Sequence, residues 1–194
     1  MCGNCIAYPH TNLYNLTMVS KLTNLLEITG ASPDTLSRSM ALGTIRAEKR
    51  GARGFVTVEG ENLYLTKEWD LISRLRRGLR TEPTVGAAYL FGSHARNDAV
   101  DSSDIDLMIV PKFPKDIIWE SCLARRLSNL LGGKVDLVIF SNLRKGEQLE
   151  IFEQGRLIVD RIDFRNRFKR AVPRLREAEK ARNDGYSRFF EANK

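Results

Sequence analysis

The chain has few of the features that mark a secreted or membrane-bound protein. It contains only three cysteines in 194 residues, and an odd, small number does not suit a disulfide framework. No apolar run is long enough to cross a membrane. The first residues lack the basic region and apolar core of a secretory signal. We therefore expect a cytoplasmic protein with no membrane association.

Zinc is also poorly supported by the cysteines that are present. Cys2 and Cys5 form a C-x-x-C pair, and His10 lies nearby. A structural zinc site needs four ligands, which usually come from two such paired segments. There is no second pair, because Cys122 stands alone in a predicted helix. Residues 1–15 are interpreted as a loosely ordered leader rather than a metal site.

Charge is distributed unevenly along the chain, whose formal net charge is +7. Residues 84–160 carry 9 Lys and Arg against 11 Asp and Glu, whereas residues 161–194 carry 11 against 5. The basic C-terminal region, 161–194, is predicted to be mostly helical, with an interruption at Pro173 and an end near Gly185. Such a region can bind nucleic acid or an acidic partner, or it can be a solvated helix.

The segment before residue 68 is predicted to begin with two helices. Apolar residues recur at helical spacing between Met18 and Ile28, and Gly30 ends this pattern. Ser32 is a suitable N-cap for a second helix, which has proline at its first position and continues to Leu42.

A β-hairpin is predicted next, with strands Phe55–Val58 and Leu63–Thr66 joined by a polar turn. Two helices followed by a hairpin resemble a winged helix-turn-helix over residues 16–67. The segment that would serve as recognition helix, Thr44–Gly51, is short and lacks an apolar stripe. A small module for protein contacts or dimerisation is the alternative.

Alternating helices and strands follow over residues 68–160, which favours an α/β sheet. A helix with one apolar and one basic side is predicted from Glu68 to Leu79, and Pro83 lies just beyond its end. The remaining strands and helices are expected, in order, at residues 87–91, 104–110, 116–131, 134–140, 143–152 and 157–159.

The stretch from Leu90 to Val110 carries the strongest chemical signal. Its first apolar run stops at Gly92 and Ser93, where glycine lets the backbone approach a phosphate and serine adds a hydroxyl. The second run opens with Asp104 and Asp106, which point to the same face of a strand because side chains alternate. Two adjacent carboxylates repel each other, and a hard cation such as Mg²⁺ removes the conflict.

A third carboxylate lies in the strand-like run that follows the next predicted helix. Asp136 is surrounded by Val135, Leu137 and Val138, and a charge inside such an apolar run needs a reason. Asp-x-Asp alone is also common at the start of strands. Together with Gly92 and Asp136, the pair indicates a catalytic cluster.

These residues resemble the signature of polymerase-β-type nucleotidyltransferases. The matching residues are Gly92-Ser93, Ala95-Arg96 and Ser103-Asp104-Ile105-Asp106-Leu107, and the spacing from Gly92-Ser93 to Asp104 agrees without a gap. The resemblance covers about Thr84 to Arg161. The chain is most similar to the minimal (MNT) branch, which includes antitoxins of HEPN/MNT toxin–antitoxin pairs. It departs from the pattern at Asn97, where the family usually has glycine. Asparagine tolerates left-handed backbone better than most residues, so the turn is expected to persist.

The resemblance implies a small mixed sheet flanked by helices and a metal-dependent transfer reaction. Asp104 and Asp106 would bind two Mg²⁺ ions, with Asp136 holding the ion nearest the attacking hydroxyl. Gly92 and Ser93 would hold the phosphates of ATP or another NTP, and Arg96 would pair with phosphate. His94 takes a position that varies in the family, and it is not expected to act as a base.

Two kinds of function are compatible with the sequence. The first is a nucleotidyltransferase that modifies a hydroxyl of a protein, such as a tyrosine of a HEPN-type toxin, or of a small molecule such as an aminoglycoside. The second is a DNA-binding regulator that uses the N-terminal module and the basic flanks, with the transferase domain as a nucleotide sensor or inactive scaffold.

Overall fold

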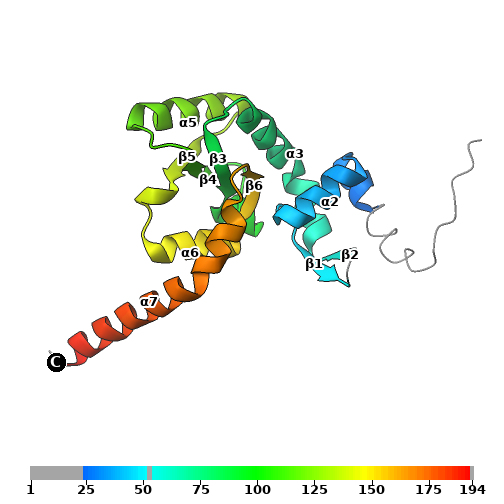
Figure 1. Ribbon diagram of the computed structural model, residues 1–194. Coiled ribbons are helices and arrows are strands. Elements are labelled where there is room, and N and C mark those ends of the chain that lie inside the picture. The colour runs from blue at the N-terminus through cyan, green and yellow to red at the C-terminus, as the bar shows by residue number, and fades with distance from the viewer. Residues whose placement is uncertain (1–23, 52–53, 193–194) are drawn as a thin grey trace, which may run out of the picture.

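The computed structural model describes residues 24–51 and 54–192, and it describes side chains up to residue 182 and at residue 184. Four strands form a mixed sheet in the order β5-β4-β3-β6 (Figure 1). They are β3 (Val85–Leu90), β4 (Ile105–Pro111), β5 (Val135–Ile139) and β6 (Arg156–Asp160). β3 is antiparallel to β4 and β6, whereas β4 and β5 run parallel. The predicted small mixed sheet is confirmed.

A helix connects the two parallel strands, as parallel pairing requires. This helix, α5 (Ile117–Leu131), begins at Asp116, whose carboxylate accepts a hydrogen bond of 2.8 Å from the Trp119 amide. It ends at Gly132, which has a left-handed φ of 73°. Because the helix carries the chain back along the sheet, β5 starts beside the start of β4.

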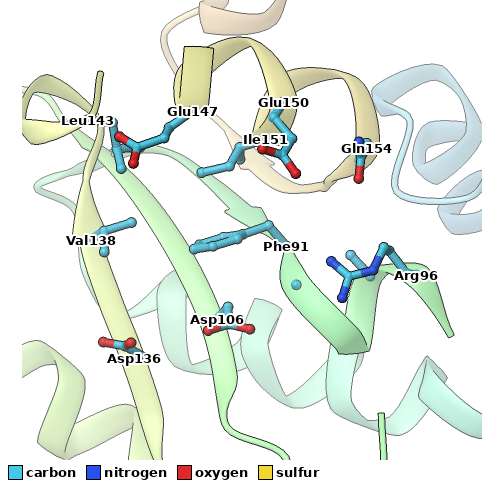
Figure 2. Close-up of a pocket in the computed structure, with 12 residues that line it drawn as sticks. Phe91, Arg96, Asp106, Asp136, Val138, Leu143, Glu147, Glu150, Ile151 and Gln154 are labelled. Atoms are coloured by element: carbon cyan, nitrogen blue, oxygen red, sulfur yellow. The ribbon is translucent and has the colours of Figure 1, made fainter. Parts of the chain in front are cut away.

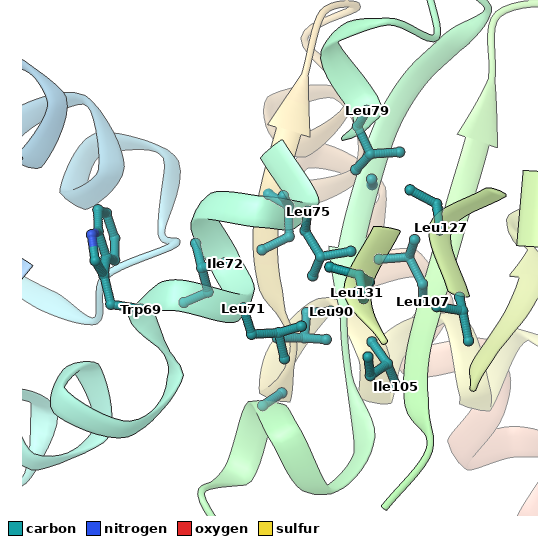
Figure 3. Close-up of a cluster of buried hydrophobic side chains, with 14 of the residues drawn as sticks. Trp69, Leu71, Ile72, Leu75, Leu79, Leu90, Ile105, Leu107, Leu127 and Leu131 are labelled. Carbon is teal, nitrogen blue, oxygen red and sulfur yellow. The ribbon is translucent and has the colours of Figure 1, made fainter. Parts of the chain in front are cut away.

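One face of the sheet is covered by α5 and by α3 (Glu61–Arg80), as Figure 1 shows. Leucines from both helices meet the inward side chains of β3 and β4 in a continuous apolar cluster (Figure 3). The members that Figure 3 labels on the two helices and the sheet include Leu71, Leu75, Leu79, Leu127, Leu131, Leu90, Ile105 and Leu107. Side chains of this size each contribute about 1.5–3 kcal/mol when fully buried.

Aromatic rings dominate the opposite face, which α6 (Lys145–Gln154) and the long α7 (Phe164–Ala192) cover. Phe140 lies in a short 3-10 helix, η2 (Phe140–Asn142), and its ring meets that of Phe164 edge-on at 4.9 Å between centroids. Phe168 stacks on Phe164 at 5.5 Å. The first turns of α7 are therefore fixed to the sheet, and the rest of the helix projects from the body (Figure 1).

α7 continues through Pro173 and Gly185, so the predicted interruption and end of this helix are wrong. Proline removes one amide donor and normally weakens a helix interior. Here Val172 and Leu175, on either side of it, pack against the aromatic cluster, which holds that turn in place. None of the helices that the structure describes, α7 included, has the length and apolar character needed to cross a membrane.

The N-terminal part consists of a helical segment at 24–29, α2 (Pro33–Leu42) and the antiparallel strands β1 (Ala47–Arg50) and β2 (Gly54–Thr57). Ser32 caps α2 and Gly43 ends it, as predicted. Leu25, Leu36 and Ile45 are fully buried in the same cluster as the leucines of α3. The segment therefore shares a core with the sheet. The division that the sequence suggested between residues 67 and 68 falls inside the helix α3. Cys2, Cys5, His10 and the predicted leader fall outside the described residues.

The predicted hairpin is wrong in its second strand, because Leu63–Thr66 belongs to α3. β2 instead pairs with β1, which occupies much of the Thr44–Gly51 segment. α3 begins at Glu61 because Tyr64, Leu65 and Trp69 are buried at helical spacing. The resemblance of this region to a winged helix stays a prediction.

A buried ion pair joins the N-terminal part to the sheet. Arg156, which opens β6, contacts Glu61 through two hydrogen bonds of 2.6 and 3.2 Å, and their side chains are only 3% and 2% exposed. Its guanidinium lies 3.4 Å from the centroid of the Tyr64 ring. It also donates to the carbonyl oxygens of Ala95 and Thr44, at 3.2 and 3.3 Å. One side chain thus connects four segments.

Breaking this pair should destabilise the protein strongly, because removal of either partner leaves a buried charge uncompensated. We expect Glu61→Leu and Arg156→Met each to lower the free energy of unfolding by about 3–5 kcal/mol, and the double variant to lose less than their sum. Urea titration measures these changes. The exposed pair Arg176–Glu153 provides the control, since Arg176→Gln should cost no more than about 1 kcal/mol. Equal costs in Glu61→Leu and the control would contradict this account.

Candidate functional site

The site begins at a tight turn directly after β3. Gly92 has a φ of 65°, and a Cβ on this residue would collide with the carboxylate of Asp106. The chain then forms a short helix, α4 (Gly92–Arg96), and leaves it through Asn97 at φ 74° and ψ 27°. The Asn97 amide donates to the carbonyl of Ser93, which closes the helix. The turn expected from the sequence therefore forms with asparagine in place of glycine.

Two of the three predicted carboxylates lie side by side. Asp106 and Asp136 are register partners on the parallel strands β4 and β5. Neighbouring strands are about 4.8 Å apart, and partners in register project to the same face. Both aspartates line a pocket of about 380 Å³ (Figure 2). Residues that are 30 positions apart in the sequence are thus brought together by the parallel pairing of their strands.

The surroundings of Asp106 disfavour its charged form. Burial raises the pKa of this carboxyl above its usual value, and the negative charges of Asp136 and Asp104 raise it further. His94 and Arg96 act in the opposite direction but do not cancel the effect. An acidic cluster of this kind is unfavourable until a cation or proton neutralises it.

Asp104, the third predicted ligand, takes a different partner. It lies one residue before β4, and its carboxylate pairs with the ammonium group of Lys134. Contact with Asp104 raises the pKa of Lys134. Asp104 is not among the residues that line the pocket. Across 24–51 and 54–192, no three His, Cys, Asp or Glu side chains are grouped closely enough to hold a metal ion by themselves.

The donor set nevertheless fits a magnesium ion. Mg²⁺ prefers oxygen ligands and is usually held by one or two carboxylates together with substrate phosphates, rather than by a cage of protein groups. Asp106 and Asp136 provide such a pair, and burial together with the charges of Asp136 and Asp104 raises the pKa of Asp106. Asp104 lies at the same end of the sheet, and its carboxylate would have to leave the ammonium group of Lys134 before it could bind the ion.

Arg96 lines the opposite side of the pocket from Asp136 (Figure 2). Its side chain is about half exposed and contacts Asp98 at 3.1 Å, so the guanidinium is accessible from solvent. Ser93 lies in the first turn of α4 but does not line the pocket. A positive group and a glycine turn thus face a pair of carboxylates across one cavity.

His94 holds α4 against α3. Its Nδ1 lies 2.9 Å from a carboxylate oxygen of the buried Glu68, and this contact raises the pKa of the imidazole. The Tyr64 hydroxyl donates a 2.8 Å hydrogen bond to the backbone carbonyl of His94. The ring therefore anchors the turn.

The far wall of the pocket was not predicted from the sequence. It is formed by α6, from which Glu147, Glu150 and Gln154 face the cavity, and by the ring of Phe91 (Figure 2). Glu147 bonds to the amide and guanidinium of Arg144, so its charge is partly compensated. These residues belong to no recognisable sequence motif. Only the packing of α6 over the sheet brings them to the site.

Comparison with known proteins agrees with this geometry. The family described as "Polymerase beta, Nucleotidyltransferase" matches residues 74–163. The chain is 37% identical to MJ0128 of Methanocaldococcus jannaschii, a provisionally named protein adenylyltransferase. The aligned stretch of 70 residues covers 36% of this chain and 71% of that protein. MJ0126 of the same organism, named in the same way, is 33% identical over 69 residues, covering 36% and 70%.

Solved structures show the same fold. One is a toxin–antitoxin structure with AMP-PNP, whose matching chain has a TM-score of 0.53 and 23% identity, over 59% of this chain and 93% of that one. A second, a mutant of the toxin–antitoxin MntA–HpeT, has a TM-score of 0.51 and 21% identity over the same shares. With 37% identity over more than two thirds of a relative, the chain belongs to the polymerase-β nucleotidyltransferase family and is a nucleotidyltransferase.

Proposed function

We propose that the protein transfers AMP from ATP to a hydroxyl group of another protein, in a reaction that depends on Mg²⁺. The observation that carries this proposal is the pairing of Asp106 with Asp136 beside the Gly92 turn in one pocket. Nucleotidyl transfer needs charge neutralisation and alignment more than covalent chemistry from the protein. The pocket offers both requirements in one place.

In this proposal the turn binds the nucleotide. Gly92 has no side chain, which lets the turn lie directly against the Asp106 carboxylate, and Ser93 would offer its amide and hydroxyl to a phosphate. Arg96 faces the same cavity and supplies positive charge, which suits the planar, bidentate contact of a guanidinium with a phosphate. These residues would position the α-phosphate for attack by the acceptor hydroxyl.

The carboxylates would bind the metal ion, and one of them would accept the proton of the attacking hydroxyl. Asp106 and Asp136 would bind Mg²⁺, with Asp104 joining them when it leaves Lys134, and two ions are proposed. When bound, magnesium neutralises phosphate charge and makes a hydroxyl easier to deprotonate. Asp136 is exposed at the edge of the pocket, where it can accept the proton of an incoming hydroxyl.

A protein is the proposed acceptor, because the two relatives described above are named as protein adenylyltransferases. The resemblance of the motifs to HEPN/MNT antitoxins suggests a tyrosine of a HEPN-type toxin as the modified group, and cytoplasmic action as an antitoxin. The related fold is found in a toxin–antitoxin structure with AMP-PNP, which supports this choice. A small-molecule acceptor would be indicated if label from ATP never appeared on protein.

Neutralising the first pair of aspartates should abolish transfer. We expect Asp104→Asn with Asp106→Asn to reduce labelling of the toxin by α-³²P-ATP at least about a hundredfold, the effect of losing one strong electrostatic contact in a transition state. Asp101→Asn is the matched control, since Asp101 is exposed in the same loop. Unchanged labelling by the double variant, with circular dichroism showing an intact fold, would refute the assignment of these carboxylates.

Asp136 should affect the rate more than the binding of ATP. Its exposed carboxylate is proposed to act on the acceptor, whereas the turn and Arg96 hold the triphosphate. Asp136→Ala is therefore expected to lower kcat strongly while the Kd for ATP, measured by calorimetry with Mg²⁺, changes less than about threefold, or about 0.6 kcal/mol. A parallel loss of both quantities would show that Asp136 holds the nucleotide's own ion.

Metal binding should be visible in stability as well as activity. The pKa of Asp106 is higher in the folded than in the unfolded protein, so its protonated carboxyl stabilises the fold at low pH. This contribution is lost as the pH rises through the raised pKa. Asp106→Asn should therefore raise the metal-free Tm at pH 7, with a smaller gain near pH 4. Adding Mg²⁺ should raise the Tm of the natural protein by a few degrees and leave that of Asp106→Asn unchanged. Equal responses of both proteins would exclude Asp106 as a ligand.

A further inference from the structure

A second pocket, of about 340 Å³, lies between the start of α2 and the C-terminal half of α3. It shares no lining residue with the catalytic pocket. Three arginines line it, Arg76, Arg77 and Arg80, together with Trp69 and the hydroxyl residue Thr35. We call it the arginine pocket.

The positive charge of the arginine pocket is not balanced by its own lining, which contains no Asp or Glu. Of the acidic groups on neighbouring turns, Asp70 pairs with Arg74 and Glu82 with Arg126, whereas Glu27 is exposed in the helical segment before the pocket and does not line it. Asp34 is in the first turn of α2 but does not line the pocket. Residues 1–23, which precede the described chain, contain no acidic residue either.

The three arginines differ in how firmly they are held. Arg76 donates to the hydroxyls of Ser39 and Thr44 at 2.9 and 2.8 Å, and its guanidinium lies 5.7 Å from the centre of the Trp69 ring. It is a fixed, partly buried charge. Arg77 and Arg80 are exposed, and no ion pair or side-chain hydrogen bond involves them within 24–51 and 54–192. The pocket thus combines one anchored cation with two exposed ones.

This arrangement costs stability unless an anion is bound. Arg76 and Arg80 are four residues apart on one helix, a spacing at which like charges destabilise the helix by a few tenths of a kcal/mol. Thr35, in the first turn of the ten-residue α2, lines the same space, where the helix dipole adds partial positive charge, but the Thr35 amide already donates to the hydroxyl of Ser32. Guanidinium groups and helix N-termini are the two protein features that best match phosphate oxygens.

We propose that the arginine pocket binds a phosphoryl group. Its volume is near the lower end of the range for ligand sites, about 300–1,000 Å³, which suits a phosphate or diphosphate better than a large cofactor. The group can be carried by a free phosphate compound or by the backbone of a nucleic acid. The site is separate from the transfer reaction, and it exists whether or not the catalytic proposal holds.

Tryptophan fluorescence gives a local measurement, because the chain has only two tryptophans. In a Trp119→Phe background, inorganic pyrophosphate is titrated with EDTA present, which suppresses metal-dependent binding at the catalytic pocket. We expect a saturable change in Trp69 emission. Arg77→Gln with Arg80→Gln should weaken the apparent affinity at least tenfold. Arg170→Gln with Arg174→Gln removes the same charge from exposed positions of α7 and should leave it unchanged.

Short oligonucleotides identify the source of the phosphate. If the pocket binds the backbone of a nucleic acid, duplex DNA or single-stranded RNA should bind with an affinity that falls as salt is added. For DNA, the slope of log affinity against log salt concentration should become shallower in the Arg77/Arg80 variant, by about 0.9 per lost phosphate contact. Pyrophosphate binding without oligonucleotide binding indicates a free phosphate compound. The proposal is overturned if neither probe binds at low salt, or if the α7 control loses as much affinity as the Arg77/Arg80 variant.

Discussion

The buried contact between Arg156 and Glu61 is the interaction on which the arrangement of the whole protein depends. It lies where the N-terminal part, α3, β6 and the turn of the catalytic pocket meet. A charge in such a place is tolerated when it is paired and each of its nitrogens is hydrogen-bonded. Arg156 meets this condition with a carboxylate, two backbone carbonyls and an aromatic face. The orientation of α4, and with it the turn at Gly92, is therefore set by contacts outside the pocket.

The parallel pairing of β4 and β5 provides the second constraint. It places Asp106 opposite Asp136 in register, and the antiparallel β3 brings Gly92 against the same carboxylate. The local result is unfavourable, since the pKa of Asp106 is raised by burial and by its acidic neighbours. Active sites commonly retain such unfavourable charge because it favours the ligand that relieves it. The large apolar cluster under α3 and α5 supplies the stability that makes this tolerable.

Sequence reasoning succeeded where a local pattern had one physical explanation. The turn at Gly92, the N-cap of α2 and the apolar strands are all set by neighbouring residues. It failed where distant contacts decide the outcome. Leu63–Thr66 has the composition of a strand, but burial of Tyr64 and the ion pair of Glu61 make it helical. In the same way, Lys134 as partner of Asp104 and the α6 wall of the pocket depend on tertiary packing that no motif records.

The absence of a side chain at Gly92 has a consequence for how this enzyme can diversify. Any larger residue there would displace Asp106, so the space beside the turn and the position of the carboxylate cannot be altered independently. Glu150 and Gln154 face the same cavity from α6 but are exposed and free of such constraints. The geometry of the turn and of Asp106 is therefore tightly constrained, whereas the wall of the pocket on α6 is not.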